Sequence, residues 1–139
     1  MSSMTTQHMS RSVREVRYLG QLRIILIDSV TQVKAEDEGH VVVTGSHGGV
    51  SSGGYAADVR AALYAFNDAG IGKDYAGVAA LLLLDERGIA ALCVSHRSAR
   101  IGEAHDTLEH GVVSMVNRAA RSQGFTPDVP LLATLKMLS

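Results

Sequence analysis

Runs of apolar residues separated by short polar segments dominate the chain and predict strands that alternate with helices. The first run, Leu22–Ile27, is nearly continuous, which is typical of a strand covered on both faces. Further strands are expected over residues 41–44, 63–66 and 89–94, although 63–66 could instead extend a preceding helix. The alternation predicts an α/β fold, a small three-layer sandwich with a mostly parallel, four- to five-stranded sheet and helices on both faces.

The connection between the first two strands is short. Residues 31–39 are charged and end in Gly39, so we expect a turn or a single helical turn there. About nine residues are few for a right-handed parallel crossover, which usually takes about a dozen or more. We therefore expect the first two strands to be antiparallel, or the first strand to lie at an edge of the sheet.

Capping residues and apolar spacing predict three helices. Ser51 and Ser52 are N-cap candidates for a helix over residues 55–62, and Asp74 is the N-cap candidate for a helix over residues 75–87.

A third helix is expected to begin at Asp106 or Thr107 and to end near Gly124. Apolar residues recur along it at helical spacing and form one amphipathic stripe: Leu108, Val112, Met115, Val116 and Ala119. The last apolar segment, residues 131–138, is expected to add an edge strand or to dock on a neighbour.

The second helix bears on assembly. Residues 75–84 contain no charged side chain, and a helix that is apolar all round must be covered all round. In a small domain one face can pack on the sheet and the other on another subunit, so we expect a homo-oligomer. The alternative is that the C-terminal segment, residues 131–138, covers the outer face.

The chain has 139 residues, which is enough for one domain with a substantial core. We assign residues 1–17 to a flexible N-terminal tail and residues 18–139 to a single α/β domain. Arg11, Arg14 and Arg17 lie at helical spacing, and we expect them to form a solvated face on a short arm or at the start of a helix.

Composition narrows the classes of function. A net charge of −1 gives no electrostatic reason to expect nucleic acid or an anionic membrane surface as a partner. No apolar run reaches the roughly 18 to 20 residues that span a bilayer, and the polar N-terminus lacks the layout of a signal peptide. The single cysteine, Cys93, excludes an internal disulfide and suits a reducing compartment. We therefore expect a cytoplasmic protein.

Polar and glycine-rich segments follow the predicted strands, and the carboxyl ends of parallel strands share one edge of a sheet. The segment after the second strand contains Ser46, His47, Gly48 and Gly49, and we expect Ser46, Gly48 and Gly49 to bind the substrate. Glycines let backbone N–H groups approach an anion closely, and the N-terminus of the next helix adds partial positive charge. His47 is a candidate acid or base because histidine exchanges protons near neutral pH. The alternative is a tight turn with an exposed histidine.

Residues 67–74 contain Gly72 and Lys73, which invites comparison with a phosphate-binding P-loop. The comparison fails because Asn67 stands where that motif has glycine and Asp74 where it has Ser or Thr. We expect Asn67 to bind substrate and Asp68 and Lys73 to be catalytic, with Lys73 holding an anion or forming an imine. Alternatively, Lys73 is a surface residue paired with Asp68 or Asp74.

The segment after the last strand supplies two arginines beside two serines. Guanidinium groups form bidentate hydrogen bonds with carboxylate or phosphate oxygens, so an anionic small molecule is the expected ligand. The substrate-binding candidates are Ser95, Arg97, Ser98 and Arg100. Ion pairs of these arginines with Glu103, Asp106 or Glu109 are the alternative.

Other sites lack a supporting pattern. The sequence contains candidate members of a Ser–His–Asp triad: Ser46 or Ser95, His47 or His96, and Asp28 or Asp68. No Gly-x-Ser-x-Gly elbow supports it. The histidines and aspartates show no metal-ligand spacing, so we assign no metal. Cys93 falls inside a strand, where we expect a buried small residue rather than a nucleophile.

These patterns predict a small cytoplasmic enzyme that acts on an anionic metabolite, a carboxylate or a phosphate ester, by acid–base chemistry. A hydrolase, a lyase and an isomerase all fit. The rival hypothesis is a non-catalytic module that binds an anionic ligand, or a subunit of a larger enzyme assembly. The sequence identifies neither a cofactor nor a substrate.

Overall fold

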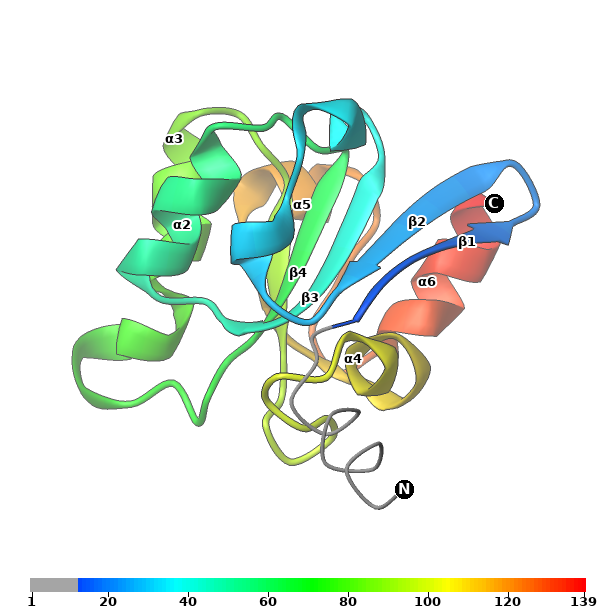
Figure 1. Ribbon diagram of the computed structural model, residues 1–139. Coiled ribbons are helices and arrows are strands. Elements are labelled where there is room, and N and C mark those ends of the chain that lie inside the picture. Colours follow the sequence, from blue (N-terminus) through cyan, green and yellow to red (C-terminus); the bar gives the residue numbers. More distant parts are fainter. Residues whose placement is uncertain (1–12) are drawn as a thin grey trace, which may run out of the picture.

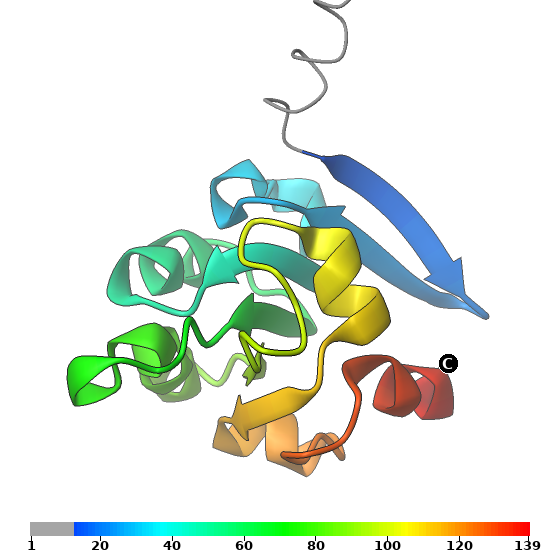
Figure 2. The ribbon, with the colours of Figure 1, turned by 90° about the horizontal axis from the view of Figure 1, so that it is seen from below.

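The computed structural model describes residues 13–139, so residues 1–12 of the predicted tail lie outside the described residues. The described residues form one six-stranded sheet with helices on both faces (Figures 1 and 2). The strands lie in chain order: β1 (Arg14–Leu19), β2 (Leu22–Ile27), β3 (Val41–His47), β4 (Leu63–Asn67), β5 (Ala91–Val94) and β6 (Val113–Val116). β2 to β5 are parallel, whereas β1 and β6 are antiparallel edge strands. The predicted α/β fold is confirmed, but the sheet is mixed and has six strands rather than four or five.

An apolar core lies on each face of the sheet. One face is covered by α2 (Val50–Ala57) and α3 (Ala79–Glu86), and the other by α4 (Ala104–His110), α5 (Arg118–Ser122) and α6 (Leu131–Leu138). Short 3-10 helices occupy two of the connections between parallel strands: η1 (Val30–Gln32), η2 (Ala35–Asp37) and η3 (Lys73–Val78). None of the helices in residues 13–139 has the length and apolarity needed to cross a membrane.

The expected arrangement of the first two predicted strands is wrong. β2 and β3 are parallel, because the whole segment 28–40, with its two short 3-10 helices, forms the crossover. Residues 14–17, assigned to the tail, belong to β1, which forms a hairpin with β2 through a two-residue turn. Gly20 has a φ of 57° there, as such a turn requires. Arg14 also anchors β1, because its guanidinium lies 2.8 Å from the buried carboxylate of Asp37.

The predicted long helix over residues 106–124 is also wrong, because this segment forms most of α4, then β6 and α5. Gly111 separates α4 from β6, since a Cβ atom there would lie 2.4 Å from the carbonyl oxygen of Thr107. The side chain of Asn117 then begins α5 by accepting a hydrogen bond from the backbone of Ala120. The spacing taken for an amphipathic stripe therefore combines residues of two helices and a strand.

Two further segments differ from expectation. The helix predicted over 75–87 is broken, because Asp74 and Tyr75 have left-handed backbone conformations and α3 begins only at Ala79. Residues 131–138 form a helix rather than an edge strand, and this helix packs near α4 on the face opposite α3. The C-terminal segment therefore does not cover the outer face of α3.

Candidate functional site

The carboxyl ends of β2 to β5 meet at one edge of the sheet, as the sequence predicted for parallel strands. The connection after β4 leads to α3 on one face, whereas the connection after β5 leads to α4 on the other face (Figure 2). Open α/β sheets bind ligands at the carboxyl edge where neighbouring connections diverge in this way. Asp68 directly follows β4 and His96 follows β5, so both lie at the point of divergence.

Asp68 and His96 are in contact. The imidazole Nδ1 of His96 lies 3.3 Å from Oδ1 of Asp68, and the backbone N–H of His96 donates to the same oxygen at 3.0 Å. The Asp68 side chain is only 6% exposed, whereas the His96 side chain is 43% exposed. A buried carboxylate thus contacts the imidazole of a partly exposed histidine.

The surroundings of Asp68 favour its ionised form. Burial opposes ionisation of this carboxyl, but hydrogen bonds from Gly70, Ser114 and His96 outweigh burial and lower the pKa of the carboxyl below its ordinary value. The carboxylate of Asp68 lies within ion-pair distance of Nδ1 of His96, so it would orient a ring that carries a proton on Nδ1. The pair therefore has the arrangement of an oriented general acid or base.

The glycine-rich segment borders the same edge. His47 lies opposite Asn67 in the sheet, and its exposed ring rests on Gly49, where a Cβ atom would lie 2.7 Å from Nε2. Gly49 is the N-cap of α2 and has no side chain to cap the helix. The first N–H groups of that helix can therefore donate hydrogen bonds to an anion. The Gly48 N–H is engaged, because it donates to the carbonyl of Asn67 at 2.9 Å.

Gly48 is required by close packing. A Cβ atom at this position would lie 2.8 Å from both Sγ of Cys93 and the carbonyl oxygen of Gly77. Cys93 itself is fully buried, and burial raises the pKa of its thiol, which keeps the sulfur protonated. Cys93 is therefore the buried small residue that its position in a strand predicted.

Four of the predicted substrate-binding residues hold backbone segments in place. Ser46 accepts from the backbone of Val30 at 2.9 Å, and the Asn67 amide donates to the carbonyl of Ala99 at 2.9 Å. The hydroxyls of Ser95 and Ser98 accept from the backbone N–H groups of Arg97 and Val112. These contacts shape the loops at the carboxyl edge.

The cationic candidates are exposed. Lys73 and Arg97 form no salt bridge with any residue of the described part, so the predicted pairing of Lys73 with Asp68 or Asp74 is not seen. Arg100 lies 3.9 Å from Glu103, and its side chain is 80% exposed. Within residues 13–139 no cluster of three or more His, Cys, Asp or Glu side chains is arranged to hold a metal ion.

The loop that carries Lys73 is strained. Six of the seven residues from 69 to 75 have positive φ, and four of them are not glycine: Ala69, Ile71, Asp74 and Tyr75. Such conformations cost on the order of 1 kcal/mol or more each and persist only where the surroundings hold them. The side chains of Asn67 and Asp68 supply that restraint, because they accept from the backbone N–H groups of Ala69 and Gly70 at 2.8 Å.

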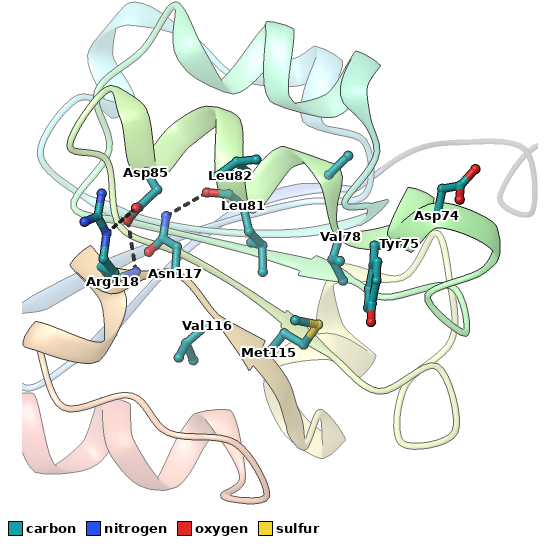
Figure 3. A pocket seen from close by; sticks show the side chains of 11 residues that line it. Asp74, Tyr75, Val78, Leu81, Leu82, Asp85, Met115, Val116, Asn117 and Arg118 are labelled. Carbon is teal, nitrogen blue, oxygen red and sulfur yellow. Dashed lines mark hydrogen bonds and ion pairs between the residues drawn. The ribbon is translucent and has the colours of Figure 1, made fainter.

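A separate apolar groove of about 670 Å³ lies between α3 and β6 (Figure 3). Tyr75, Val78, Leu81, Leu82, Met115 and Val116 form its apolar walls. Asp74 lies at one end, and Asp85, Asn117 and Arg118 lie at the other. The groove contains none of the residues predicted to bind or transform a substrate.

Two residues of the site, His96 and Ser114, are not among the predicted site residues. The sequence offers His96 as a triad member at the carboxyl edge, and it predicts Ser114 within a helix. Neither spacing nor composition shows that His96 contacts a carboxylate 28 positions earlier in the chain. The available signal was the position of His96 directly after a predicted strand. Comparison of the chain with models of protein families, with curated proteins and with solved structures gave no match.

Proposed function

We propose that the protein is an enzyme that transfers a proton on a small anionic metabolite, with His96 as the general acid or base and Asp68 as its orienting partner. The contact between the buried carboxylate and the solvent-facing imidazole carries this proposal. Such a group typically contributes about 10²- to 10⁴-fold to the rate of a reaction. A carboxylate or a phosphate ester is the proposed substrate, and a hydrolase, a lyase or an isomerase is consistent with this chemistry.

The surrounding groups suit an anion. The uncapped N-terminus of α2 presents N–H donors beside His47, and Lys73 and Arg97 carry positive charges on neighbouring loops. In this proposal His47 is a second proton-transfer group, and Lys73 and Arg97 hold the substrate. No cofactor is assigned, and the cytoplasmic location stays a prediction.

A non-catalytic module that binds an anionic ligand is the second candidate. Its support is the exposure of His47, Lys73 and Arg97, which is typical of a binding surface rather than of a site that excludes water. A measurement of turnover distinguishes the two candidates, because an enzyme converts its ligand and a binding module does not.

The test compares wild-type protein with His96→Gln and His110→Gln in mixtures of carboxylates and phosphate esters, followed by NMR. His110 is the matched control, because its Nδ1 also contacts an aspartate, Asp106 at 2.9 Å, on the surface of α4. We expect wild-type and His110→Gln protein to convert one compound, and His96→Gln to be slower by about 10²-fold or more.

Thermal shifts with the same compounds would show whether His96→Gln still binds the substrate, as we expect. Equal turnover by His96→Gln and wild-type protein would contradict the assigned role. Binding of an anion by wild-type protein without any conversion would favour the non-catalytic module.

A further inference from the structure

We infer that the groove between α3 and β6 is the contact surface for a second copy of this chain, related to the first by a two-fold axis. This inference is independent of the proposed proton transfer, because the groove contains neither Asp68 nor His96. The uncharged segment 75–84 predicts a homo-oligomer, and in this inference the groove is its subunit interface.

The surface combines a hollow with projecting apolar side chains. Leu82 is 68% exposed and Tyr75 is 66% exposed, although both border the groove. Beside them Met115 and Val116 lie on β6, the last strand of the sheet, so no further strand within residues 13–139 covers this side. In a two-fold dimer the same surface of both copies forms the contact, so that surface must be complementary to itself. Here the exposed side chains of Leu82 and Tyr75 on one copy could enter the groove of the other.

Charged side chains lie at both ends of the groove. Asp74 lies at one end, and no salt bridge engages it within the described part of the chain. Arg118 lies at the other end, where its side chain is 89% exposed. Of its side-chain nitrogens only Nε contacts Asp85, at 2.8 Å (Figure 3). The terminal amino groups of Arg118 therefore remain available to a second carboxylate.

Two-fold symmetry reverses the direction of the groove in the second copy. Asp74 of each copy then faces Arg118 of the other, and the contact contains two equivalent ion pairs. The second copy would also bury Leu82 and Tyr75, whose exposure the fold itself leaves unexplained because α6 packs on the opposite face. These two features favour a second copy over an apolar small molecule, which would pair neither Asp74 nor the terminal nitrogens of Arg118.

The first test measures mass in solution by light scattering during size-exclusion chromatography. We expect wild-type protein to be a dimer and Leu82→Asp to be a monomer. Met137→Asp is the matched control, since Met137 is an 84% exposed apolar residue of α6, on the other face, and this variant should stay dimeric. A monomeric wild-type protein at about 100 μM, or a dimer that Leu82→Asp leaves intact, would overturn the inference, as would a dimer that both variants disrupt.

The second test identifies the pairing across the axis. Asp74→Arg and Arg118→Asp should each weaken dimerisation by about 10-fold or more, because each places like charges opposite one another. The double variant Asp74→Arg/Arg118→Asp should regain most of the affinity. Arg118→Asp also loses its contact with Asp85, so thermal unfolding of each variant separates that intramolecular cost from dimerisation. Failure of the double variant to dimerise better than either single variant would show that these charges do not meet.

Discussion

At the scale of single residues, Asp68 connects more of the candidate site than any other side chain. It restrains the strained loop after β4 through Gly70, orients His96 after β5, and interacts with Ser114 on β6. The backbone N–H groups of Gly70 and His96 donate hydrogen bonds to it, so the carboxylate is stabilised in its charged form despite its burial. A single ionised group thus determines both the shape of the loop and the orientation of the imidazole.

Asp68→Asn should lower the free energy of unfolding at pH 7 by about 1–3 kcal/mol. An amide has one acceptor oxygen where the carboxylate has two. Its NH₂ group would also place two donors beside the backbone N–H groups of Gly70 and His96, which are themselves donors. The pKa of Asp68 is lowered on folding, so its ionised form contributes stability above its ordinary pKa of about 4. That contribution is lost as pH falls through the lowered value. Urea unfolding between pH 3 and pH 7 should therefore show a difference between wild type and variant that shrinks toward acid.

Asp58→Asn is the control, because Asp58 is an exposed residue at the end of α2. It should change the free energy of unfolding by less than about 0.5 kcal/mol at any pH in this range. If the difference between wild type and Asp68→Asn did not depend on pH, the ionised carboxylate would not be the stabilising species.

At the scale of elements, the sequence allowed the parallel strands to be located but not the boundaries set by packing. β3 and β4 follow from β-branched and apolar runs bounded by glycines and polar residues. β6 was missed because residues 112–116 continue an apolar spacing that also fits a helix. A Cβ atom at Gly111, where α4 ends, would contact the carbonyl oxygen of Thr107 in α4 itself and also Val94, which lies on a strand distant in sequence. The contact with Val94 is tertiary and leaves no local signal.

Gly111→Ala should therefore destabilise the protein. Its Cβ atom would lie 2.4 Å from the carbonyl oxygen of Thr107 and 2.8 Å from Cγ1 of Val94, so backbone must move. We expect a loss of about 1–3 kcal/mol in the free energy of unfolding by urea. Gly54→Ala is the matched comparison, because Gly54 lies within α2 with nothing within 4 Å of the added atom.

The Gly54→Ala variant should gain about 0.5–1 kcal/mol, since alanine restricts the unfolded chain and favours a helix. Equal effects of the two substitutions would mean that crowding at Gly111 does not define the boundary between α4 and β6.

At the scale of the whole molecule, the sheet brings together segments that are far apart in the chain. The order of the parallel strands predicted that His47, Asn67 and Ser95 would share one edge, and the structure places them there. The pairing of Asp68 with His96 could not be predicted, because it depends on where two loops turn after leaving adjacent strands. The edge of the sheet therefore follows from the sequence, whereas the contact of His96 with Asp68 does not.

The central claim is that Asp68 orients the imidazole of His96 at the same edge of the sheet as the N-terminus of α2, where we propose that an anion binds. An NMR titration of ¹⁵N-labelled protein with inorganic phosphate, which records imidazole and amide signals together, tests it most directly. We expect the neutral His96 ring to carry its proton on Nδ1, and its signals to shift with those of the Val50 and Ser51 amides at a single dissociation constant. A neutral ring protonated on Nε2, or phosphate shifts that leave His96 and the start of α2 unchanged, would contradict the account.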